Sequence, residues 1–378
     1  MSGDHEPIVS MDDLSVHYEN RASFLQSLPK SIRNRFDIED PDVVRAVDEA
    51  NLDIYDNEVV AVVGESGCGK TTLGKTAVAL QEPTSGSLKY RGDDIGGIKR
   101  GESDSDREFS DIRRALQIIH QDPEAAVNPN QRVIETLKEP LRKWQPDLSE
   151  REQRERIIAL MEKVGVTPAS DYIERFPHQL SGGEQQRVVL CRALLMEPDL
   201  ILADEAVSAL DVSLRVEAMD LMLELQDIFD TSFIFISHNL SNARYFAGRA
   251  GGRIAVMYLG EIVEIGPARE VVKNPQHPYT KVLKWATPNL DPEQAEESLR
   301  EEPPMRGVDI PDPIDPPSGC RFHTRCPEAR EACVRNAPEA TTINGSEHEV
   351  ACFRERSADH EYWSSEPLEE KAVGRLDN

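Results

Sequence analysis

The sequence predicts an α/β fold in which helices cover a mostly parallel β-sheet. Three short apolar runs have the length and composition of buried strands: VVAVV at 59–63, LILAD at 200–204 and SFIFIS at 232–237. A glycine-rich loop and a helical pattern follow the first run, and a helical segment at 212–230 separates the other two. Strands that alternate with helices in this way form parallel sheets, because a parallel connection needs a long crossover.

Weaker patterns complete the predicted fold. Residues 7–18 alternate enough to form an edge strand, and a polar insertion follows to about Arg45. The acidic run GESDSDREFS at 101–110 predicts an exposed loop, and residues 130–196 are dominated by helical patterns. GRIAVMYLGEIVEIG then predicts a final hairpin, and HPYTKVLKWATP predicts the helix that closes this part of the chain.

Length and composition indicate a cytoplasmic globular protein. The 378 residues correspond to about two folded units, and the 39% hydrophobic and 30% charged residues are typical of soluble proteins. The longest apolar runs fall far short of the roughly 20 residues that cross a membrane. The acidic opening MSGDHEPIVSMDD lacks the basic region of a signal peptide. We therefore expect a protein that reaches the membrane only through its partners.

The formal net charge of -26 arises from 69 acidic and 43 basic residues. Such a surface repels the phosphate backbone, which disfavours nucleic acid as a partner. Excess carboxylate is tolerated best where salt screens it, with a Debye length of about 3 Å at 1 M. We therefore hypothesise a protein from a salt-rich environment, whose stability falls in very dilute salt. An ordinary acidic cytosolic protein is the alternative.

GESGCGKT at 64–71 matches the phosphate-binding loop pattern and stands between a predicted buried strand and a predicted helix. Its glycines allow successive backbone N–H groups to face phosphate oxygens, and the following helix adds a favourable dipole. Lys70 is expected to hold the β- and γ-phosphates, and the Thr71 hydroxyl to complete a Mg²⁺ shell. The alternative is a chance glycine turn, which this context disfavours.

Two carboxylates follow the second apolar run, where LILADE ends in Asp204 and Glu205. Asp204 is expected to bind Mg²⁺ through water, and Glu205 to polarise the attacking water. His238 comes directly after the third run, from which it can reach a γ-phosphate at the same sheet edge. The alternatives are a solvated strand end for the carboxylates and a structural role for the histidine.

Four of the six cysteines crowd into the C-terminal stretch with the spacing C-x5-C-x6-C-x18-C: Cys320, Cys326, Cys333 and Cys352. In a cytosolic protein such clustering indicates a metal site rather than disulfides. Four thiolates bind tetrahedral zinc or an iron-sulfur cluster, and the paired C-x2-4-C knuckles that zinc sites favour are absent from the sequence. Zinc, a cluster and no metal all stay open from these residues alone.

LSGGEQQR at 180–187 lies between the two phosphate motifs and resembles the signature of the ABC ATPases. Gln121 in QIIHQDP resembles the Q-loop residue of that family, SALD at 208–211 its D-loop, and His238 its switch histidine. Tyr18 resembles the aromatic residue that stacks on adenine, with a core strand tyrosine as the alternative. The resemblance implies a P-loop ABC nucleotide-binding domain with a RecA-like parallel sheet core, an antiparallel β subdomain and a helical signature subdomain.

The resemblance also implies which residues act on ATP and Mg²⁺. Two subunits share each ATP, because the phosphate loop of one faces the signature of another, so a second ATPase subunit is required. The expected catalytic residues are Lys70, Gln121, Glu205 and His238. The expected nucleotide-binding residues are Tyr18, Gly64, Glu65, Ser66, Gly67, Cys68, Gly69, Lys70, Thr71, Thr72 and Asp204, with Thr71, Gln121 and Asp204 around Mg²⁺. The expected signature residues are Leu180, Ser181, Gly182, Gly183 and Glu184, and the expected D-loop residues are Ser208 and Asp211.

Longer segments resemble the oligopeptide and dipeptide importer branch of this family, among them GESGCGKTTLGKT, RRALQIIHQDPEAAVNP, DEAVSALDVS and RIAVMYLGEIVEIG followed by HPYT. The C-terminal GCRFHTRC...C...HEVAC unit also resembles this branch, and it implies a [4Fe-4S] cluster. The branch further implies a paralogous partner ATPase, two transmembrane permease subunits and an external substrate-binding protein. The chain is then expected at the cytoplasmic face of the cell membrane.

Three other functions compete with peptide import. The same ATPase role could serve nickel or an oligosaccharide, since substrate selection lies in the other subunits. A soluble ABC protein that acts on DNA or ribosomes is disfavoured by the acidic, single-cassette chain. A redox module with an idle cassette is disfavoured by the intact set of Lys70, Asp204, Glu205 and His238.

Departures from the family pattern are few. Thr71 stands where serine is usual, Ala206 replaces a proline and Asn239 replaces an aspartate, but none removes a catalytic group. The expected organisation is a nucleotide-binding domain at 1–287 with its helical subdomain at about 122–196, a proline-rich acidic linker at 288–318, a cysteine-rich unit at 319–354 and an acidic tail at 355–378, disordered from about Arg354.

Overall fold

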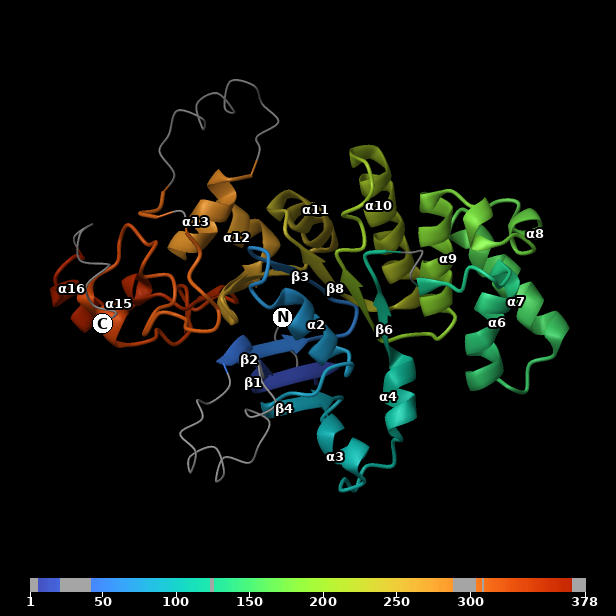
Figure 1. Ribbon diagram of the computed structural model, residues 1–378, viewed down its shortest axis with the longest axis horizontal. Coiled ribbons are helices and arrows are strands. Elements are labelled where there is room, and N and C mark those ends of the chain that lie inside the picture. The colour runs from blue at the N-terminus through green and yellow to red at the C-terminus, as the bar shows by residue number, and fades with distance from the viewer. Residues whose placement is uncertain (1–5, 21–41, 123–125, 288–303, 308, 369–378) are drawn as a thin grey trace.

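The computed structural model describes residues 6–20, 42–122, 126–287, 304–307 and 309–368. It contains two β-sheets, a group of helices beyond one end of the larger sheet and a C-terminal unit beyond its other end (Figure 1). The smaller sheet lies beside the larger one, with helix α2 (Lys70–Ala77) at their junction (Figure 1). The glycine-rich loop that precedes α2 therefore lies where these parts meet.

The larger sheet joins distant parts of the chain in the order β11, β12, β10, β9, β3, β8, β7, β6. The three strands predicted from apolar runs are confirmed, and β8 lies between β3 and β7. The short strand β6 was not predicted, because four residues carry no clear periodicity. The parallel strands are β3 (Val59–Val63), β6 (Leu116–Ile119), β7 (Leu200–Asp204), β8 (Ser232–Ser237) and β9 (Arg253–Tyr258).

Alternate residues of the central strands face two separate hydrophobic cores. Val59, Ala61 and Val63 face the core that contains most of the helices, whereas Val60 and Val62 face the core shared with the antiparallel sheet. Both faces of the sheet are covered, so these strands are apolar throughout instead of alternating.

The smaller sheet is antiparallel, with the strand order β2, β1, β4, β5. Its first strand lies between two others, so the prediction of an edge strand at 7–18 was wrong. The chain from Asp42 onward supplies the missing partner, although it was assigned to the end of a polar insertion. The rest of that insertion lies outside the described residues. The four strands are β1 (Val9–Asn20), β2 (Asp42–Ile54), β4 (Ser85–Tyr90) and β5 (Asp93–Asp94).

The helical pattern predicted at 130–196 is confirmed as a group of four helices (Figure 1). Ser149 and Ser181 begin two of them with reciprocal capping boxes. The group consists of α6 (Val133–Trp144), α7 (Glu150–Lys163), α8 (Ala169–Tyr172) and α9 (Gly182–Leu194). The other helices of the cassette are α3 (Ile95–Arg100), α4 (Phe109–Ala115), α10 (Val212–Phe229), α11 (Leu240–Ala250), α12 (Ala268–Lys273) and α13 (Pro278–Trp285).

The cysteine-bearing C-terminal unit extends the larger sheet. Strand β12 (Glu349–Val350) pairs antiparallel with β10 (Glu261–Pro267), and β11 (Thr341–Thr342) pairs with β12. The expected linker is in part folded, because Met305 packs against the larger core and the Arg306 N–H donates to the Arg325 carbonyl at 2.9 Å. Residues 288–303 and 308 lie outside the described parts of the chain.

The chain beyond Arg354 is folded as far as Leu368, so the expectation of a disordered tail from that point was wrong. Tyr362 and Leu368 are only 4% and 7% exposed. The acidic composition misled the prediction, because Tyr362 completes the small C-terminal core and Leu368 packs into the larger core. Residues 369–378 lie outside the description. The local elements are α15 (Glu331–Arg335), the 3-10 helix η3 (Phe353–Glu355) and α16 (Glu361–Ser364).

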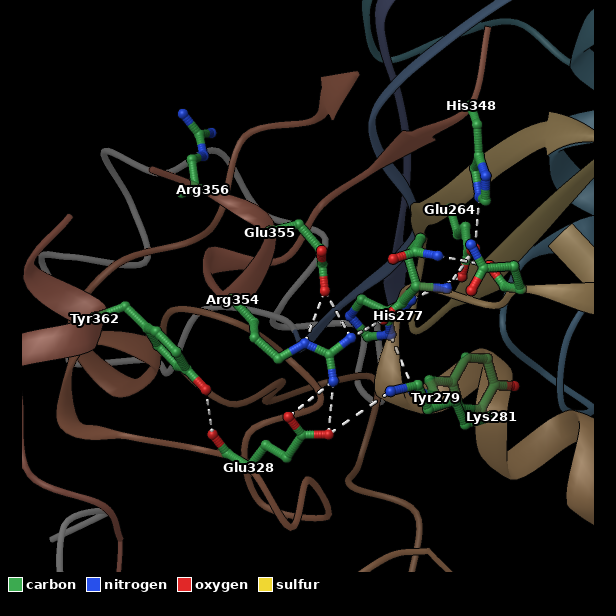
Figure 2. Close-up of polar contacts among 12 residues, drawn as sticks. Glu264, His277, Tyr279, Lys281, Glu328, His348, Arg354, Glu355, Arg356 and Tyr362 are labelled. Carbon is green, nitrogen blue, oxygen red and sulfur yellow. Dashed lines mark hydrogen bonds and ion pairs between the residues drawn. The ribbon is translucent and has the colours of Figure 1, made fainter. Parts of the chain in front are cut away.

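Glu264 of β10 joins the sheet to two later segments of the chain (Figure 2). Its buried carboxylate accepts the backbone N–H groups of Gln276 and His277 at 2.8 and 2.9 Å, and His348 Nε2 lies 2.7 Å away. Arg354 closes the same contact by donating to the Gln276 carbonyl at 2.7 Å. A buried carboxylate is stable only with such partners, so this side chain fixes the start of α13 against the C-terminal unit.

The environment of His277 predicts acid sensitivity. Its Nδ1 accepts the N–H of Tyr279 at 3.1 Å, and burial lowers the pKa of His277 from 6.5 to about 4. Between these two pH values His277 is protonated in the unfolded chain but neutral in the folded chain. The free energy of unfolding should therefore fall as the pH drops from about 6.5 to about 4. His277 accounts for a loss of about 3 kcal/mol in the free energy of unfolding at the lower of these pH values.

Chemical unfolding at a series of pH values in constant salt checks this prediction. In His277→Asn the free energy of unfolding should fall less steeply on acidification, because the asparagine oxygen can still cap α13 but does not titrate. His178→Asn, a change at an exposed histidine, should leave the slope of the parent protein unchanged. An equally steep fall in His277→Asn would contradict the role of this histidine.

Candidate nucleotide site

The loop GESGCGKT joins the end of β3 to the first turn of α2. Two of its glycines are required by close approach. A Cβ on Gly64 would lie 2.1 Å from the Met257 carbonyl oxygen, and one on Gly69 would lie 1.9 Å from that of Ala46. Gly69 also precedes α2 with a φ of 106°, which favours glycine. The loop thus wraps tightly around the helix N-terminus, a geometry that suits an anion.

The ammonium group of Lys70 spans this loop. Lys70 Nζ donates to the carbonyl oxygens of Gly64 at 2.9 Å and Glu65 at 2.8 Å, and the residue is only 5% exposed. A buried ammonium held by carbonyl oxygens is a fixed positive charge inside the loop. It can exchange one carbonyl for a phosphate oxygen, which is the role predicted from the sequence.

Thr71 of helix α2 and Asp204 of strand β7 meet at the same sheet edge. The Thr71 hydroxyl donates to Asp204 Oδ1 at 2.9 Å. Thr71 lies in the first turn of α2, and Asp204 is the last residue of β7. A hydroxyl and a carboxylate are the hard oxygen ligands that Mg²⁺ prefers, so this pair fits the predicted metal position.

Glu205 and His238 form a second pair beside the first. His238 Nδ1 lies 3.4 Å from Glu205 Oε2, and both side chains reach solvent. Glu205 leaves the end of β7 with a positive φ of 50°, and its N–H donates to the Ile236 carbonyl of β8 at 3.2 Å. The Ser208 hydroxyl donates to the Glu205 carbonyl at 2.8 Å, so the turn that carries the carboxylate is fixed on both sides.

The LSGGEQQR segment begins helix α9. Ser181 is its N-cap: the Ser181 Oγ accepts the Glu184 N–H at 3.3 Å, and the Ser181 N–H donates to Glu184 Oε2 at 2.7 Å. This backbone hydrogen bond lowers the pKa of Glu184. Leu180 is buried, whereas Ser181 and Gly182 are exposed and Gly183 is partly exposed. The helix N-terminus is therefore open to a ligand from outside this chain.

Comparisons with known proteins identify this combination. The ABC transporter family profile matches residues 47–208, and the profile of the oligopeptide/dipeptide transporter C-terminal region matches residues 263–333. The di/tripeptide transport ATP-binding protein DppF of Pseudomonas aeruginosa is 38% identical over 92% of this chain and 97% of its own length. The oligopeptide transport ATP-binding protein OppF of Salmonella typhimurium is 39% identical over 92% of this chain and 96% of its own.

The chain belongs to the ATP-binding proteins of ABC transporters. It is an ABC-type ATPase, and it shares the C-terminal region of the oligopeptide/dipeptide branch. A solved dimer of the ATP-binding cassette MJ0796, bound to ADP and phosphate, has a TM-score of 0.54, 25% identity, and a match to 69% of this chain and 99% of the cassette. Within the described residues, no helix combines the length and apolar character needed to span a membrane.

Three other predicted positions of this ABC ATPase are less enclosed. Gln121 is exposed just beyond the end of β6, next to residues 123–125, which the structure does not describe. Tyr18 is 42% exposed on β1, so the alternative of a core tyrosine is wrong, and adenine stacking stays a prediction. Asp211 caps α10 by accepting the N–H groups of Ser213 and Leu214, each at 3.0 Å.

Sequence reasoning missed one residue that links the signature to the catalytic turn. Gln186 Nε2 donates to the Ala206 carbonyl at 2.8 Å, and Gln186 is buried. Ala206 directly follows Glu205, so this hydrogen bond attaches α9 to the turn that carries the carboxylate. The signature pattern includes Gln186, but only the fold reveals its partner, because the two residues are far apart in the sequence.

Two further residues missed as site residues contact the phosphate loop from the C-terminal region. The Glu65 N–H donates to the Tyr279 hydroxyl at 2.8 Å, and Arg325 forms two hydrogen bonds with the Glu65 carboxylate at 2.9 and 3.0 Å. The HPYT segment was a signal for Tyr279, although it gave no contact. Nothing in the sequence pointed to Arg325, because an arginine beside a cysteine is not diagnostic.

The four C-terminal cysteines line one pocket, together with Phe322, Phe353 and Tyr362. All four are free thiols. Burial raises the pKa of each, to about 12 for Cys326 and about 11 for Cys352, and repulsion among neighbouring thiols adds to the increase for Cys320. In the described parts of the chain, no three His, Cys, Asp or Glu side chains are arranged to hold one metal ion. The fold thus gathers the thiols without setting them at ligand positions.

The contact between Thr71 and Asp204 predicts a specific loss on mutation. Mg²⁺ should raise the affinity for ATP in the parent protein. In Thr71→Val this increase should be about tenfold smaller, because a methyl group of similar size replaces the hydroxyl. Calorimetric titration of ATP with Mg²⁺ and with chelator measures this increase. Thr71→Ser keeps the hydroxyl and is the matched control. A full Mg²⁺ effect in Thr71→Val would exclude this hydroxyl from the metal shell.

Proposed function

We propose that this chain hydrolyses ATP to power the import of di- or oligopeptides across the cell membrane. The observation that carries the proposal is the joint match of both parts of the chain, to the ABC transporter family and to the oligopeptide/dipeptide C-terminal region. The relatives named for di/tripeptide and oligopeptide transport are matched over nearly their whole length. A soluble ABC protein would have no need of this C-terminal region.

The proposed mechanism assigns each polar group at the sheet edge one task. Lys70 binds the β- and γ-phosphates, and Thr71, Asp204 and Gln121 would hold Mg²⁺, which would supply positive charge beside the phosphates. Glu205 orients the attacking water and accepts its proton. His238, within 3.4 Å of the Glu205 carboxylate, contacts the γ-phosphate and fixes that carboxylate. Tyr18 stacks on the adenine ring.

The proposed site is completed by a second ATPase subunit. Ser181 and Gly182 are exposed at the N-terminus of α9, where backbone N–H groups and the helix dipole can bind the γ-phosphate of an ATP held by another chain. The chain offers one signature and one phosphate loop, so two subunits enclose two ATP molecules. We propose a paralogous chain as the partner, with the D-loop residues Ser208 and Asp211 at the contact.

We propose that a permease subunit docks in a groove between the sheet edge and the helical group. The groove has a volume of about 680 Å³ and is lined by Arg113, His120, Lys143, Trp144 and Arg192, among others. Three cationic side chains and one carboxylate, Glu139, line the groove, although the chain as a whole carries a charge of -26. Such a patch suits a short acidic or amphipathic segment on the cytoplasmic face of the membrane. An external binding protein would deliver the peptide to the assembled complex.

We propose that Cys320, Cys326, Cys333 and Cys352 hold a [4Fe-4S] cluster. Their four free thiols line one buried pocket, and this donor set suits either such a cluster or zinc. Raised pKa values keep the thiols protonated at neutral pH, so binding must displace protons and shift the side chains into ligand positions. The cluster would cross-link the C-terminal unit.

We further propose that the protein functions in a salt-rich cytoplasm. The charge of -26 makes the surface strongly acidic, and exposed ion pairs such as Arg100–Glu102 and Arg151–Glu155 contribute little to stability. Salt at molar concentration shortens the reach of the remaining repulsion to about 3 Å.

Loss of transport on mutation of Glu205 tests the proposed function. In the assembled complex, Glu205→Gln should lower ATP hydrolysis at least about 100-fold and leave ATP binding intact, because the amide cannot accept the proton. Cells with this variant should lose uptake of labelled di- and oligopeptides but keep uptake of nickel and oligosaccharides. Glu224→Gln, an exposed change on α10, is the control. Loss of nickel or oligosaccharide uptake with intact peptide uptake would overturn the peptide assignment.

Metal analysis tests the proposed cluster. Protein purified without oxygen in high salt should contain about four irons and matching sulfide per chain, with a broad brown absorbance. Cys326→Ser should lose most of the iron, whereas Cys191→Ala, which removes a thiol packed in α9, should keep it. Stoichiometric zinc, or no metal, would contradict the cluster and leave the ATPase unaffected.

A further inference from the structure

We infer that the C-terminal region acts as a clamp on the phosphate loop, with Arg325 and Tyr279 as positioning residues for ATP binding at Glu65. The inference rests on the proposed ATPase site, because it assigns a task to two residues that contact the phosphate loop from outside it. Glu65 is the second residue of GESGCGKT and lies between the end of β3 and Lys70. Two separate parts of the C-terminal region reach this one residue.

The first contact orients the peptide bond between Gly64 and Glu65. The Glu65 N–H donates to the Tyr279 hydroxyl at 2.8 Å, and the Gly64 carbonyl accepts from Lys70 Nζ at 2.9 Å. In a trans peptide the N–H and C=O groups point in opposite directions, so Tyr279 and Lys70 hold the same unit from its two sides. Tyr279 is fully buried, and burial raises its pKa well above 10, so the hydroxyl stays neutral.

The second contact holds the side chain of Glu65. Arg325 Nη1 and Nη2 donate to the two carboxylate oxygens at 2.9 and 3.0 Å, which is the bidentate geometry of a strong ion pair. Only 4% of the Arg325 side chain is exposed. Its guanidinium lies 5.8 Å from the ring centre of Tyr258 and 5.7 Å from that of Phe322. These rings fix the direction in which the buried arginine points.

The ion pair also has an electrostatic consequence for the bound anion. Glu65 brings a negative charge into a loop that must bind a triphosphate, in a chain whose net charge is already -26. Arg325 neutralises that carboxylate and shields it from the phosphates. Without the arginine, the carboxylate repels ATP and is free to leave its place in the loop. Arg325 thus contributes both to the shape of the loop and to its charge.

The clamp connects the nucleotide site to the cysteine pocket. Arg325 directly precedes Cys326, and the short segment between Cys320 and Cys326 is wound by hydrogen bonds from His323, Arg325 and Cys326. A change in the packing of the pocket therefore displaces the guanidinium. Because linkage is reciprocal, any such change that alters ATP affinity must itself be altered by ATP to the same extent.

Calorimetric titration of Mg-ATP into the full chain tests the clamp. Arg325→Gln should raise the Kd for Mg-ATP about tenfold. The Kd of Arg325→Lys should lie between those of Arg325→Gln and the parent protein. Adding Glu65→Gln to Arg325→Gln should restore most of the affinity, because it removes the uncompensated charge. The defect of Arg325→Gln should shrink in high salt, which screens that charge. Tyr279→Phe should weaken binding several-fold.

Arg330→Gln is the matched control, because Arg330 donates to the Ser365 carbonyl at 2.7 Å within the C-terminal unit. It should leave the Kd for Mg-ATP unchanged even where it lowers the melting temperature. A lower melting temperature with unchanged Kd in Arg325→Gln would overturn the clamp, as would a double variant that binds no better than Arg325→Gln. If the parent chain fails to bind Mg-ATP at all, the proposed function fails instead, so the two failures are distinguishable.

Discussion

The pairing of three parallel strands is the constraint on which the rest of the structure depends. Val63 of β3 lies opposite Ser237 of β8, and Ile236 of β8 lies opposite Asp204 of β7. The three strands therefore end at one level, and the residues that follow them emerge side by side. A shift of one residue in the register of a strand would move each of its side chains to the opposite face of the sheet, and so into the other hydrophobic core. The hydrophobic packing that fixes the register thus also assembles the nucleotide site.

The C-terminal part of the chain supports the ATP-binding cassette at two places, the larger sheet and the phosphate loop. The C-terminal unit adds two short strands to the larger sheet, and Glu264 of β10 contacts both His348 of that unit and the N–H of His277 at the start of α13. The C-terminal region also reaches the phosphate loop through Tyr279 and Arg325. An appended unit attached through a linker could not hold the loop in this way, because a flexible linker transmits no geometry. The phosphate loop of this chain is therefore supported by both the cassette and its extension.

The distribution of charge lets the acidic chain bind an anion at a few defined positions. Lys70 is a buried ammonium inside the phosphate loop, Arg325 neutralises the one carboxylate of that loop, and a basic groove lies near the helical group. Elsewhere the surface is acidic, which opposes nonspecific association with anions. Burial strengthens the effect of Lys70 and Arg325, because the field of a charge is stronger where water is excluded.

The sequence by itself determined the parallel strands, the helical group and the polar groups of the nucleotide site, because each is encoded in a short contiguous pattern. Lys70, Thr71, Asp204, Glu205 and His238 were predicted from spacing and are brought together. Only the tertiary structure decided the inner place of β1, the folded end of the chain and the contacts of Gln186, Tyr279 and Arg325. These depend on pairing between residues far apart in the sequence, and a local pattern holds no information on which distant partner a strand, an amide or a guanidinium will meet.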